Sequence, residues 1–375
     1  MKILHVIDTL DFVRGGPPQV CSNVITEQAK NHEIGLVSYS SEETNRASIA
    51  EVNFENFTVS SFDIGEALFG SRSALKFKEI TTDYDVVHLH NAWEPLLLSG
   101  ANYANEHSIP YAITLHGMLD EWPMRQKTLK KRLALLLGRR NLIAGAKFVQ
   151  ALSKNEEEGI RKLGFTNRCE VIPNGISLEV ADQSLCKDEF NDAYPQLAEK
   201  PFVLFLGRLH YVKGLDILAK AALSFFEQFP DWRLVVAGPD AGMKNAFEEA
   251  IESSGIESKV HLLGPIYGSM KYSLLASCQI FCAPSRQEAF SVSIVEAMAA
   301  GKPVAITTEC HFEKIRTSRS GLVVDFDADL LSRSFCELAG SKELRLEMGK
   351  NGRRLVEQTY NWKAISQQLT HCYAN

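Results

Sequence analysis

Short runs of apolar residues alternate with longer segments of helical periodicity along most of the chain. Apolar runs rich in Val, Ile, Leu and Phe predict buried strands, and the segments between them predict helices. Because strands separated by helices form parallel sheets, we expect an α/β protein whose ligands bind beyond the carboxyl ends of the strands. The expected strands are 2–8, 35–39, 54–62, 85–90, 111–116, 147–151, 169–172, 202–206, 233–237, 261–263, 280–283, 303–306 and 321–324.

Length and a change in pattern divide the chain into two parts. Its 375 residues are enough for two domains, each with its own core. Residues 177–200 are acidic and weakly periodic, so we interpret them as a connection between a first domain at 1–176 and a second at 201–360. Residues 361–375 place apolar side chains on one helical stripe and are expected to form a C-terminal helix.

The segment 284–307 combines a loop, a helix and a strand around two glutamates. Ser291 or Ser293 can cap the helix. Glu288 lies in the loop and Glu296 about one turn inside the helix, so both can face the strand ends. The free amides of a helix N-terminus suit a phosphate, and carboxylates accept hydrogen bonds from sugar hydroxyls. The segment predicts a nucleotide-sugar site, although either glutamate taken alone could equally be a solvated charge.

Two cations lie close together in the loop after strand 202–206. Arg208 and Lys213 are five residues apart, between a strand and the helix that follows it. Both side chains can turn toward one diphosphate. A solvated loop also carries such charges, so spacing alone leaves both interpretations open.

Glycine and polar residues follow several strands of the first domain. Gly15 and Gly16 lie between the first strand and its helix, where glycine lets the backbone approach a ligand, although a tight turn would also place them there. His90 and Asn91 follow one strand, and His116 ends the next. Each of these positions is expected at the ligand-binding edge of the sheet. A histidine at a strand end is also often a packed, hydrogen-bonded residue.

Residues 122–147 contain eight cations and no acid. Leucines recur at helical spacing within this basic run. One interpretation is a solvated basic face over a stripe that packs on the protein's own core. The alternative is a surface for anionic headgroups or for a phosphorylated acceptor.

Composition and targeting signals exclude other classes of function. The net charge of −6 gives no overall attraction to nucleic acid, and no apolar stretch approaches the length of a membrane span. Eight cysteines without a CxxC pair indicate buried thiols in a reducing compartment. The first residues are typical of a core strand rather than of a signal peptide. We therefore expect a cytoplasmic protein.

Two Asp-x-Asp triplets are typical of metal-dependent transferases. Asp83 and Asp85 precede a strand, whereas Asp325 and Asp327 follow the last strand in an acidic loop. Neither placement favours a shared metal site, so we expect no metal and no bound cofactor.

The motifs together resemble the retaining glycosyltransferases of family 4, which have the two-domain GT-B fold. The family signature is Glu-(Gly/Ala)-Phe-(Gly/Ala/Ser), four further residues, and Glu-Ala-Met-Ala-x-Gly-x-Pro-Val. Residues 288–291 read EAFS and residues 296–304 read EAMAAGKPV. The family motif Gly-Arg-Leu-x-x-x-Lys-Gly matches GRLHYVKG at 207–214, and its Pro-Asn-Gly matches 173–175. The resemblance implies two Rossmann-like domains facing each other across a cleft, with residues 361–375 crossing back onto the first domain.

The resemblance also implies a reaction and a set of roles. A glycosyl group moves, with retention, from a nucleotide diphosphate sugar to an acceptor hydroxyl, without a metal. The implied catalytic residues are His116, Glu288, Arg208 and Lys213. The implied donor-binding residues are Gly16, Arg208, Lys213, Ile266, Glu288, Ala289, Phe290, Ser291, Val292 and Glu296, and the acceptor-side residues are Gly15, Gly16, His90, Asn91 and His116.

Within these roles, Arg208 and Lys213 hold the diphosphate, Glu288 takes sugar hydroxyls, and Glu296 takes the ribose. The chain departs from the family after its glycine pair. Many members carry an acid there, and this chain has Pro17, Pro18 and Gln19 instead.

The loop around 116–127 is similar to that of members that build bacterial surface polysaccharides on lipid-linked intermediates. We therefore expect a saccharide or lipid-linked acceptor and a peripheral association with the inner face of an anionic membrane through 122–147. The alternatives are a nucleotide-sugar epimerase of the same fold and a catalytically silent nucleotide-binding member. The residues do not distinguish the base, the sugar or the linkage.

Overall fold

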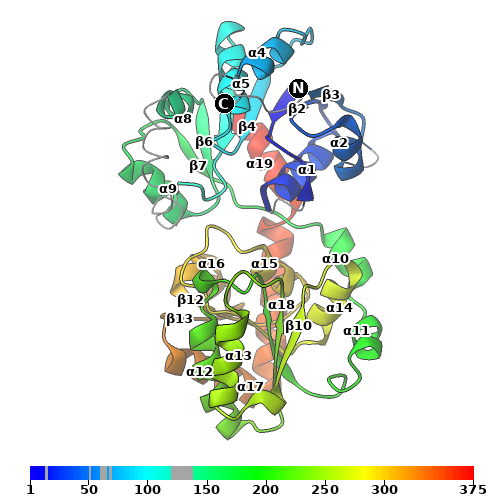
Figure 1. Ribbon diagram of the computed structural model, residues 1–375, viewed down its shortest axis with the longest axis vertical. Coiled ribbons are helices and arrows are strands. Elements are labelled where there is room, and N and C mark those ends of the chain that lie inside the picture. The colour runs from blue at the N-terminus through cyan, green and yellow to red at the C-terminus, as the bar shows by residue number, and fades with distance from the viewer. Residues whose placement is uncertain (13–15, 50–51, 60–65, 67–69, 120–137) are drawn as a thin grey trace. The chain divides into compact units, whose positions relative to one another are not determined.

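The computed structural model describes residues 1–12, 16–49, 52–59, 66, 70–119 and 138–375 (Figure 1). The chain forms two compact units. One consists of Met1–Asn174 together with Trp362–Asn375, and the other is Gly175–Asn361. Each is built around a parallel sheet, so the expected α/β class is confirmed.

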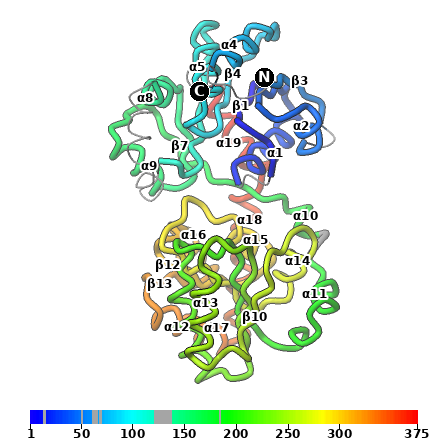
Figure 2. Tube along the Cα trace, in the orientation of Figure 1, coloured from blue at the N-terminus to red at the C-terminus, as the bar shows by residue number. Residues whose placement is uncertain are grey.

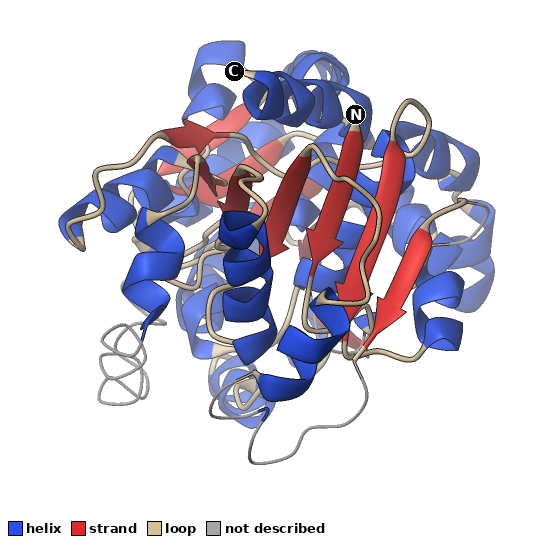
Figure 3. Cartoon of the chain, turned by 90° about the horizontal axis from the view of Figure 1, so that it is seen from above, coloured by secondary structure: helices blue, strands red, loops and turns tan. Residues whose placement is uncertain are grey.

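The sheet of the first unit has the strand order β3-β2-β1-β4-β5-β6-β7, and every neighbouring pair is parallel. The order reverses between β1 and β4, and such a reversal opens a crevice at the carboxyl ends of the strands. Figure 3 shows strands side by side with helices on both faces. The strands are β1 (Lys2–Val6), β2 (Glu33–Ser38), β3 (Glu55–Thr58), β4 (Val86–His90), β5 (Tyr111–Thr114), β6 (Phe148–Ala151) and β7 (Cys169–Val171).

The helices of the first unit cover its sheet with apolar stripes. They are α1 (Gly16–Gln28), α2 (Glu42–Ser48), α4 (Ser71–Phe77), α5 (Pro95–Glu106), α8 (Arg140–Ala144), α9 (Lys154–Lys162) and α19 (Trp362–Ala374). The last of these comes from the C-terminus, is drawn in red, and packs against α1 (Figures 1 and 2). Its buried stripe contains Trp362, Ile365, Leu369 and Tyr373, which join the core formed by β1 and α1.

The sheet of the second unit has the order β10-β9-β8-β11-β12-β13, again parallel, with its reversal between β8 and β11. The central strands are buried along their whole length, which explains their continuous apolar sequences. The strands are β8 (Phe202–Leu206), β9 (Arg233–Ala237), β10 (Val260–Gly264), β11 (Ile280–Ala283), β12 (Val304–Thr307) and β13 (Gly321–Val324).

The second unit also contains the segment expected to connect the domains. Residues 177–200 hold two helices, α10 and α11, both of which pack on α14. No described helix combines the length and the apolar character that crossing a bilayer requires. The helices are α10 (Leu178–Ser184), α11 (Asp188–Ala193), α12 (Leu215–Gln228), α13 (Lys244–Ser253), α14 (Gly268–Ser277), α15 (Val292–Ala299), α16 (Glu313–Ser318), α17 (Ala328–Gly340) and α18 (Lys342–Thr359).

Candidate active site

The predicted donor residues follow the two strands at which the second sheet reverses its order. The loop 207–214 leaves β8, and the loop 284–291 leaves β11, the strand hydrogen-bonded to β8. Chain topology therefore brings these two loops to the same edge of the sheet, where α/β proteins bind ligands.

The two loops are in direct contact. Gly214 has a φ of +69°, and a Cβ at this position would overlap the main-chain carbonyl of Pro284. Only glycine meets both demands at low cost, which explains the Lys-Gly pair in the sequence. The contact holds the short 3₁₀ helix Tyr211–Lys213 against the loop that carries Glu288.

Lys213 and Glu288 form an ion pair across this contact. The ammonium of Lys213 donates to Oε1 of Glu288, and the hydroxyl of Ser285 donates to the same oxygen at 2.8 Å. Only 10% of the Glu288 side chain is exposed. Within the described residues no hydrogen bond reaches Oε2 of Glu288, so this oxygen can accept a ligand hydroxyl.

Arg208 lies in the same loop but not in this pair. It is exposed, and its guanidinium makes no hydrogen bond within the described part of the chain. An exposed arginine beside a half-buried lysine can hold an anionic ligand, because its donors are free to form bidentate bonds.

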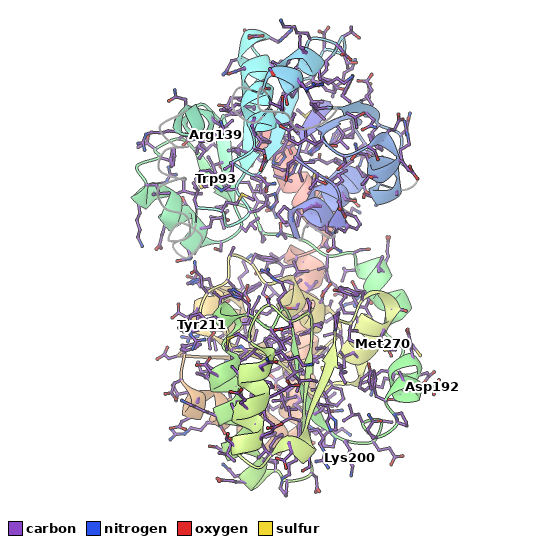
Figure 4. The ribbon with its side chains drawn as sticks, in the orientation of Figure 1. Trp93, Arg139, Asp192, Lys200, Tyr211 and Met270 are labelled. Carbon is purple, nitrogen blue, oxygen red and sulfur yellow. The ribbon has the colours of Figure 1, made fainter. Side chains whose placement is uncertain are left out.

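Arg286 fixes the loop that carries Lys213, a role that was not predicted from the sequence. Its amide donates to the carbonyl of Val212 at 2.7 Å, and its Nη1 donates to the carbonyl of Tyr211 at 2.7 Å. Nη2 donates to Asp216 at 2.5 Å, and the guanidinium stacks 4.1 Å from the ring centre of Tyr211, labelled in Figure 4. Burial would raise the pKa of Asp216, but the hydrogen bond and charge of Arg286 outweigh it and lower that pKa.

The start of α15 differs from the prediction in one respect. Ser291 is the residue that precedes the helix, but its side chain makes no capping hydrogen bond and pairs instead with the hydroxyl of Ser293 at 3.1 Å. The amides of the first turn of α15, which includes Val292, are therefore not occupied by a side-chain cap. They can donate to a phosphate.

Other predicted donor residues have packing roles. Phe290 lies 5.0 Å from Phe312 between ring centres, and Ile266 is half-buried against the core of the second unit. Ala289, between Glu288 and Phe290, is half-buried.

Glu296 also has a lysine partner, which the sequence did not predict. Nζ of Lys271, on α14, donates to Oε1 of Glu296 at 2.5 Å, and only 9% of the Glu296 side chain is exposed. In both glutamates of the signature, a lysine thus donates to one of the two side-chain oxygens.

In the first unit, the predicted His90 belongs to a buried chain of hydrogen bonds, together with two histidines that were not predicted as site residues. His5 lies on β1, and His88 and His90 lie on β4, the neighbouring strand at the reversal. Nδ1 of His5 lies 3.0 Å from Nε2 of His90, and Nε2 of His5 lies 2.8 Å from Oε1 of Gln28. On the other branch, Tyr373 contacts His88 at 2.5 Å.

One main-chain carbonyl, that of Ile172, determines which group donates and which accepts in every hydrogen bond of this series. The amide nitrogen of Gln150 must donate to the carbonyl of Ile172, so Oε1 of Gln150 accepts from the hydroxyl of Thr114. The oxygen of Thr114 then accepts from Nε2–H of His88. It follows that Nδ1 of His88 accepts from the Tyr373 hydroxyl.

The same reasoning continues to His90. The Tyr373 hydroxyl uses its only hydrogen in the bond to His88, so its oxygen accepts from the amide nitrogen of Gln28. This orientation of the amide turns Oε1 of Gln28 toward His5. His5 therefore carries its proton on Nε2, and its Nδ1 accepts from Nε2–H of His90. The chain ends at Nδ1 of His90, which has no partner in the described structure.

Burial keeps these imidazoles neutral. It lowers the pKa of His5 to about 4 and that of His116 to about 3, and it lowers the pKa values of His88 and His90 well below the ordinary value. His116 has a φ of +51°, and its ring stacks on that of His90 with centroids 5.7 Å apart. Its Nε2 is enclosed and has no hydrogen-bond partner among the residues that the structure describes. The structure thus brings His90 and His116 together.

Of the remaining residues predicted for the acceptor side, the structure describes Asn91 and Gly16. Asn91, with a φ of +84°, donates from Nδ2 to Asp8 at 2.6 Å. Gly16 is exposed and begins α1, and Gly15 lies outside the described residues.

The aspartates of the Asp-x-Asp triplets have other partners. Asp85 accepts from the amide of Lys2 at 2.8 Å, and Asp327 caps α17 by accepting from the amides of Asp329 and Leu330, both at 2.9 Å. Elsewhere in the described chain, His5, Cys21 and His90 lie close enough to share an ion. They do not fit a metal, because both imidazoles hydrogen-bond each other and burial raises the pKa of the Cys21 thiol.

Three cations of the basic run are bound within the first unit and do not face outward as free charges. The guanidinium of Arg139 is largely buried and donates to the carbonyl of Trp93 at 2.8 Å (Figure 4). Arg140 donates to the carbonyl of Leu163 at 3.2 Å, and Lys147 to that of Tyr373 at 2.9 Å. The other five cations, at 125–132, lie outside the described residues.

Comparison with known proteins agrees with this architecture. The family model described as Glycosyl transferases group 1 matches residues 187–355, and that described as Glycosyltransferase Family 4 matches residues 14–180. A phosphatidyl-myo-inositol mannosyltransferase of Mycobacterium leprae is 28% identical over 297 residues, which cover 78% of this chain and 73% of that protein. An uncharacterised glycosyltransferase of Methanocaldococcus jannaschii is 26% identical over 299 residues, covering 77% and 75%.

Solved structures share the fold over the whole chain. The Anabaena protein HepE in complex with UDP and glucose has a TM-score of 0.78 at 20% identity, covering 100% of this chain and 99% of that one. Sucrose-phosphate synthase from Thermosynechococcus elongatus has a TM-score of 0.75 at 20% identity, covering 100% and 98%. Two family models that divide the chain between them, with structural likeness over its full length, show that this protein belongs to the glycosyltransferases of family 4, of the group 1 type, with an α/β fold of the GT-B class.

Proposed function

We propose that the protein transfers a sugar from a nucleotide diphosphate sugar to the hydroxyl of a saccharide or lipid-linked acceptor, with retention at the anomeric carbon and without a metal. The observation that carries the proposal is the group of Lys213, Glu288 and the uncapped start of α15 at the reversal of the second sheet. It combines a cation and free amides for phosphate with a carboxylate oxygen for sugar hydroxyls.

The residues divide the chemistry of bond cleavage between them. As the bond from the anomeric carbon to the diphosphate breaks, negative charge grows on the departing oxygens. Arg208, Lys213 and the amides of α15 are placed to receive this charge, and such preorganised donors are commonly the largest contribution to catalysis. Oε2 of Glu288 accepts from the sugar and fixes its orientation. No step requires a metal ion, because the protein's own donors neutralise the leaving group.

In the first unit, we propose that the edge containing His90, Asn91 and His116 binds the acceptor side of the reaction. Within the described residues, Nδ1 of His90 is a hydrogen-bond acceptor without a partner and Nε2 of His116 is also unpaired, which suits both to a ligand that presents hydroxyl groups. Relatives named phosphatidyl-myo-inositol mannosyltransferases support an acceptor of the lipid-linked class.

A thermal-shift screen of UDP, GDP, ADP and their sugars tests the donor class, since a ligand that binds the native state raises its unfolding temperature. The nucleotide that shifts the midpoint is then used as its sugar in transfer assays with EDTA in excess. The anomeric configuration of the product, read by NMR, decides retention. Interconversion of the donor without acceptor would instead indicate an epimerase, and complete loss of turnover in EDTA would contradict metal independence.

A further inference from the structure

Lys271 is a partly buried cation that forms its ion pair with one of the two signature glutamates. It lies on α14, whereas Glu296 lies on α15. The Nζ–Oε1 distance is 2.5 Å, and the exposed fractions of the two side chains are 21% and 9%. The ammonium also lies 4.8 Å from the ring centre of Tyr272, so two groups fix its position. Met270, which precedes Lys271 on α14, is labelled in Figure 4 and shows where this part of the helix lies.

The attachment of α14 to the second unit does not depend on this pair. Tyr272, Leu274 and Leu275 are buried in the core of the unit. Ser273 accepts from the amide of Phe190 at 2.9 Å, and Lys302 donates to the carbonyl of Ala276, at the end of α14, at 2.7 Å. A buried ion pair is in general weak evidence for stability, because desolvation of its charges offsets their attraction. The pair therefore needs another explanation.

Electrostatics supplies an explanation for the ion pair of Lys271 and Glu296. Burial by itself would lower the pKa of Lys271, but the charges and hydrogen bonds of Glu296 and Tyr272 together outweigh burial and raise this pKa, so the lysine stays protonated. In turn, an enclosed carboxylate without a cation would tend to take up a proton. A protonated carboxyl loses part of its acceptor capacity, whereas an ionised one accepts at both oxygens. Lys271 occupies Oε1 and Tyr272 also hydrogen-bonds the Glu296 side chain, which leaves further lone pairs of the carboxylate for a ligand.

We propose that Lys271 is a positioning residue for the ribose of the donor. It holds Oε1 in place, so that the remaining lone pairs of the carboxylate can accept from the two hydroxyls of a ribose ring. The inference rests on the proposed function, since it assumes a nucleotide donor, and it adds a determinant of selectivity. The site should prefer ribonucleotides to 2′-deoxyribonucleotides, because loss of one hydroxyl removes a donor to Glu296.

Titration calorimetry with Lys271→Met tests this inference. The probes are UDP, GDP and ADP, the 2′-deoxy form of whichever binds wild type, and inorganic pyrophosphate, which lacks ribose. We expect the variant to bind the nucleotide about tenfold or more weakly, the scale of one charged hydrogen bond, and to lose the preference for ribose. Pyrophosphate should bind wild type and variant equally.

Lys302→Met is the matched control, because Lys302 is also a partly buried lysine that contacts α14 but donates to a carbonyl and not to Glu296. It should bind nucleotide as wild type does. Lys271→Arg keeps the cation and should retain the preference for ribose, which separates loss of charge from a folding defect.

Several outcomes would overturn the inference alone: unchanged nucleotide affinity in Lys271→Met, an equal loss for pyrophosphate, or an equal loss in Lys302→Met. If wild type binds none of the three nucleotides, the proposed function fails first and the inference falls with it.

Discussion

His5 accepts a hydrogen bond from His90 across the neighbouring strands β1 and β4, with Nδ1 and Nε2 3.0 Å apart. His5 cannot be a cation in this arrangement without placing two donors against each other, because its other nitrogen already donates to Gln28. We predict that His5, His88 and His90 are all neutral and carry their proton on Nε2. Long-range ¹⁵N–¹H NMR of histidine-labelled protein distinguishes this tautomer directly.

A variant at Gln28 tests the His5 part and the His88 part of this hydrogen-bond series separately. Gln28→Leu disconnects His5 from Tyr373, so His5 should show a mixture of tautomers. His88 should keep its proton on Nε2, because Thr114 still accepts from it and Tyr373 still donates to it. A proton on Nδ1 of His90 in wild type would disprove the direction assigned here.

The same histidines predict an acid-sensitive stability. Their folded pKa values lie below the unfolded value of about 6.5, so the unfolded state binds more protons between these values. Stability is therefore fully present above about pH 6.5 and falls toward pH 4, by about 1.4 kcal/mol per pH unit for each histidine. Calorimetry in buffers of different ionisation enthalpy should show proton uptake on unfolding at pH 5.5. Absence of uptake would mean that the histidines are not held neutral.

The proposed binding of the diphosphate by Arg208 and Lys213 predicts a large kinetic effect when either cation is removed. Arg208→Ala and Lys213→Ala each leave the departing phosphate charge without one donor, which typically costs about 2.7–4 kcal/mol of barrier, or about 100- to 1000-fold in turnover. Steady-state kinetics with the cognate donor measures the loss. Lys220→Ala, on the helix that follows the loop, is the control and should be fully active. Equal activity in the Arg208 and Lys213 variants would mark these cations as solvated loop charges.

The two glutamates should fail in different ways. Glu288→Gln should lose discrimination among donor sugars while the free nucleotide diphosphate still binds. Glu296→Gln should weaken the free nucleotide itself, since the ribose is common to both ligands. The affinities of each variant for the nucleotide and for the nucleotide sugar test this difference. Equal weakening of free-nucleotide binding in both variants would contradict the roles assigned to the two glutamates.

The basic run predicts attraction to membranes through its N-terminal part. Arg139, Arg140 and Lys147 are already bound to carbonyls, so the prediction concerns the cations of 125–132. Each cation near an anionic surface adds roughly 1 kcal/mol, screened by salt. Cosedimentation with anionic vesicles should be lost when Lys130, Lys131 and Arg132 are changed to Ser, with transfer to a soluble acceptor unchanged. A wild type that ignores such vesicles at low salt would contradict the prediction.

The features predicted from sequence are those that depend on neighbouring residues. The buried strands and the loop positions of Arg208 and Glu288 follow from local pattern and from the edge rule of parallel sheets. The predicted cap at Ser291 failed because a nearby hydroxyl, that of Ser293, competes for the same side chain.

Partners that meet only in the folded sheet gave no local signal. Lys213 and Glu288 are separated by 75 positions, and His5 and His90 by 85. Lys271 is separated from Glu296 by 25 positions and lies in a helix of ordinary composition. Arg286 is a single loop cation, whose role depends on the carbonyls that the packed loops present to it.

The helix α19 constrains how the protein can be made. It completes the core of the first unit, although the whole of residues 175–361 is synthesised in between. During translation, β1 and α1 are therefore synthesised long before α19, and the face that will receive Tyr373 stays exposed until α19 is made. The core of the first unit is complete only after α19 has been synthesised, so a truncation before Trp362 would damage the N-terminal unit of the molecule.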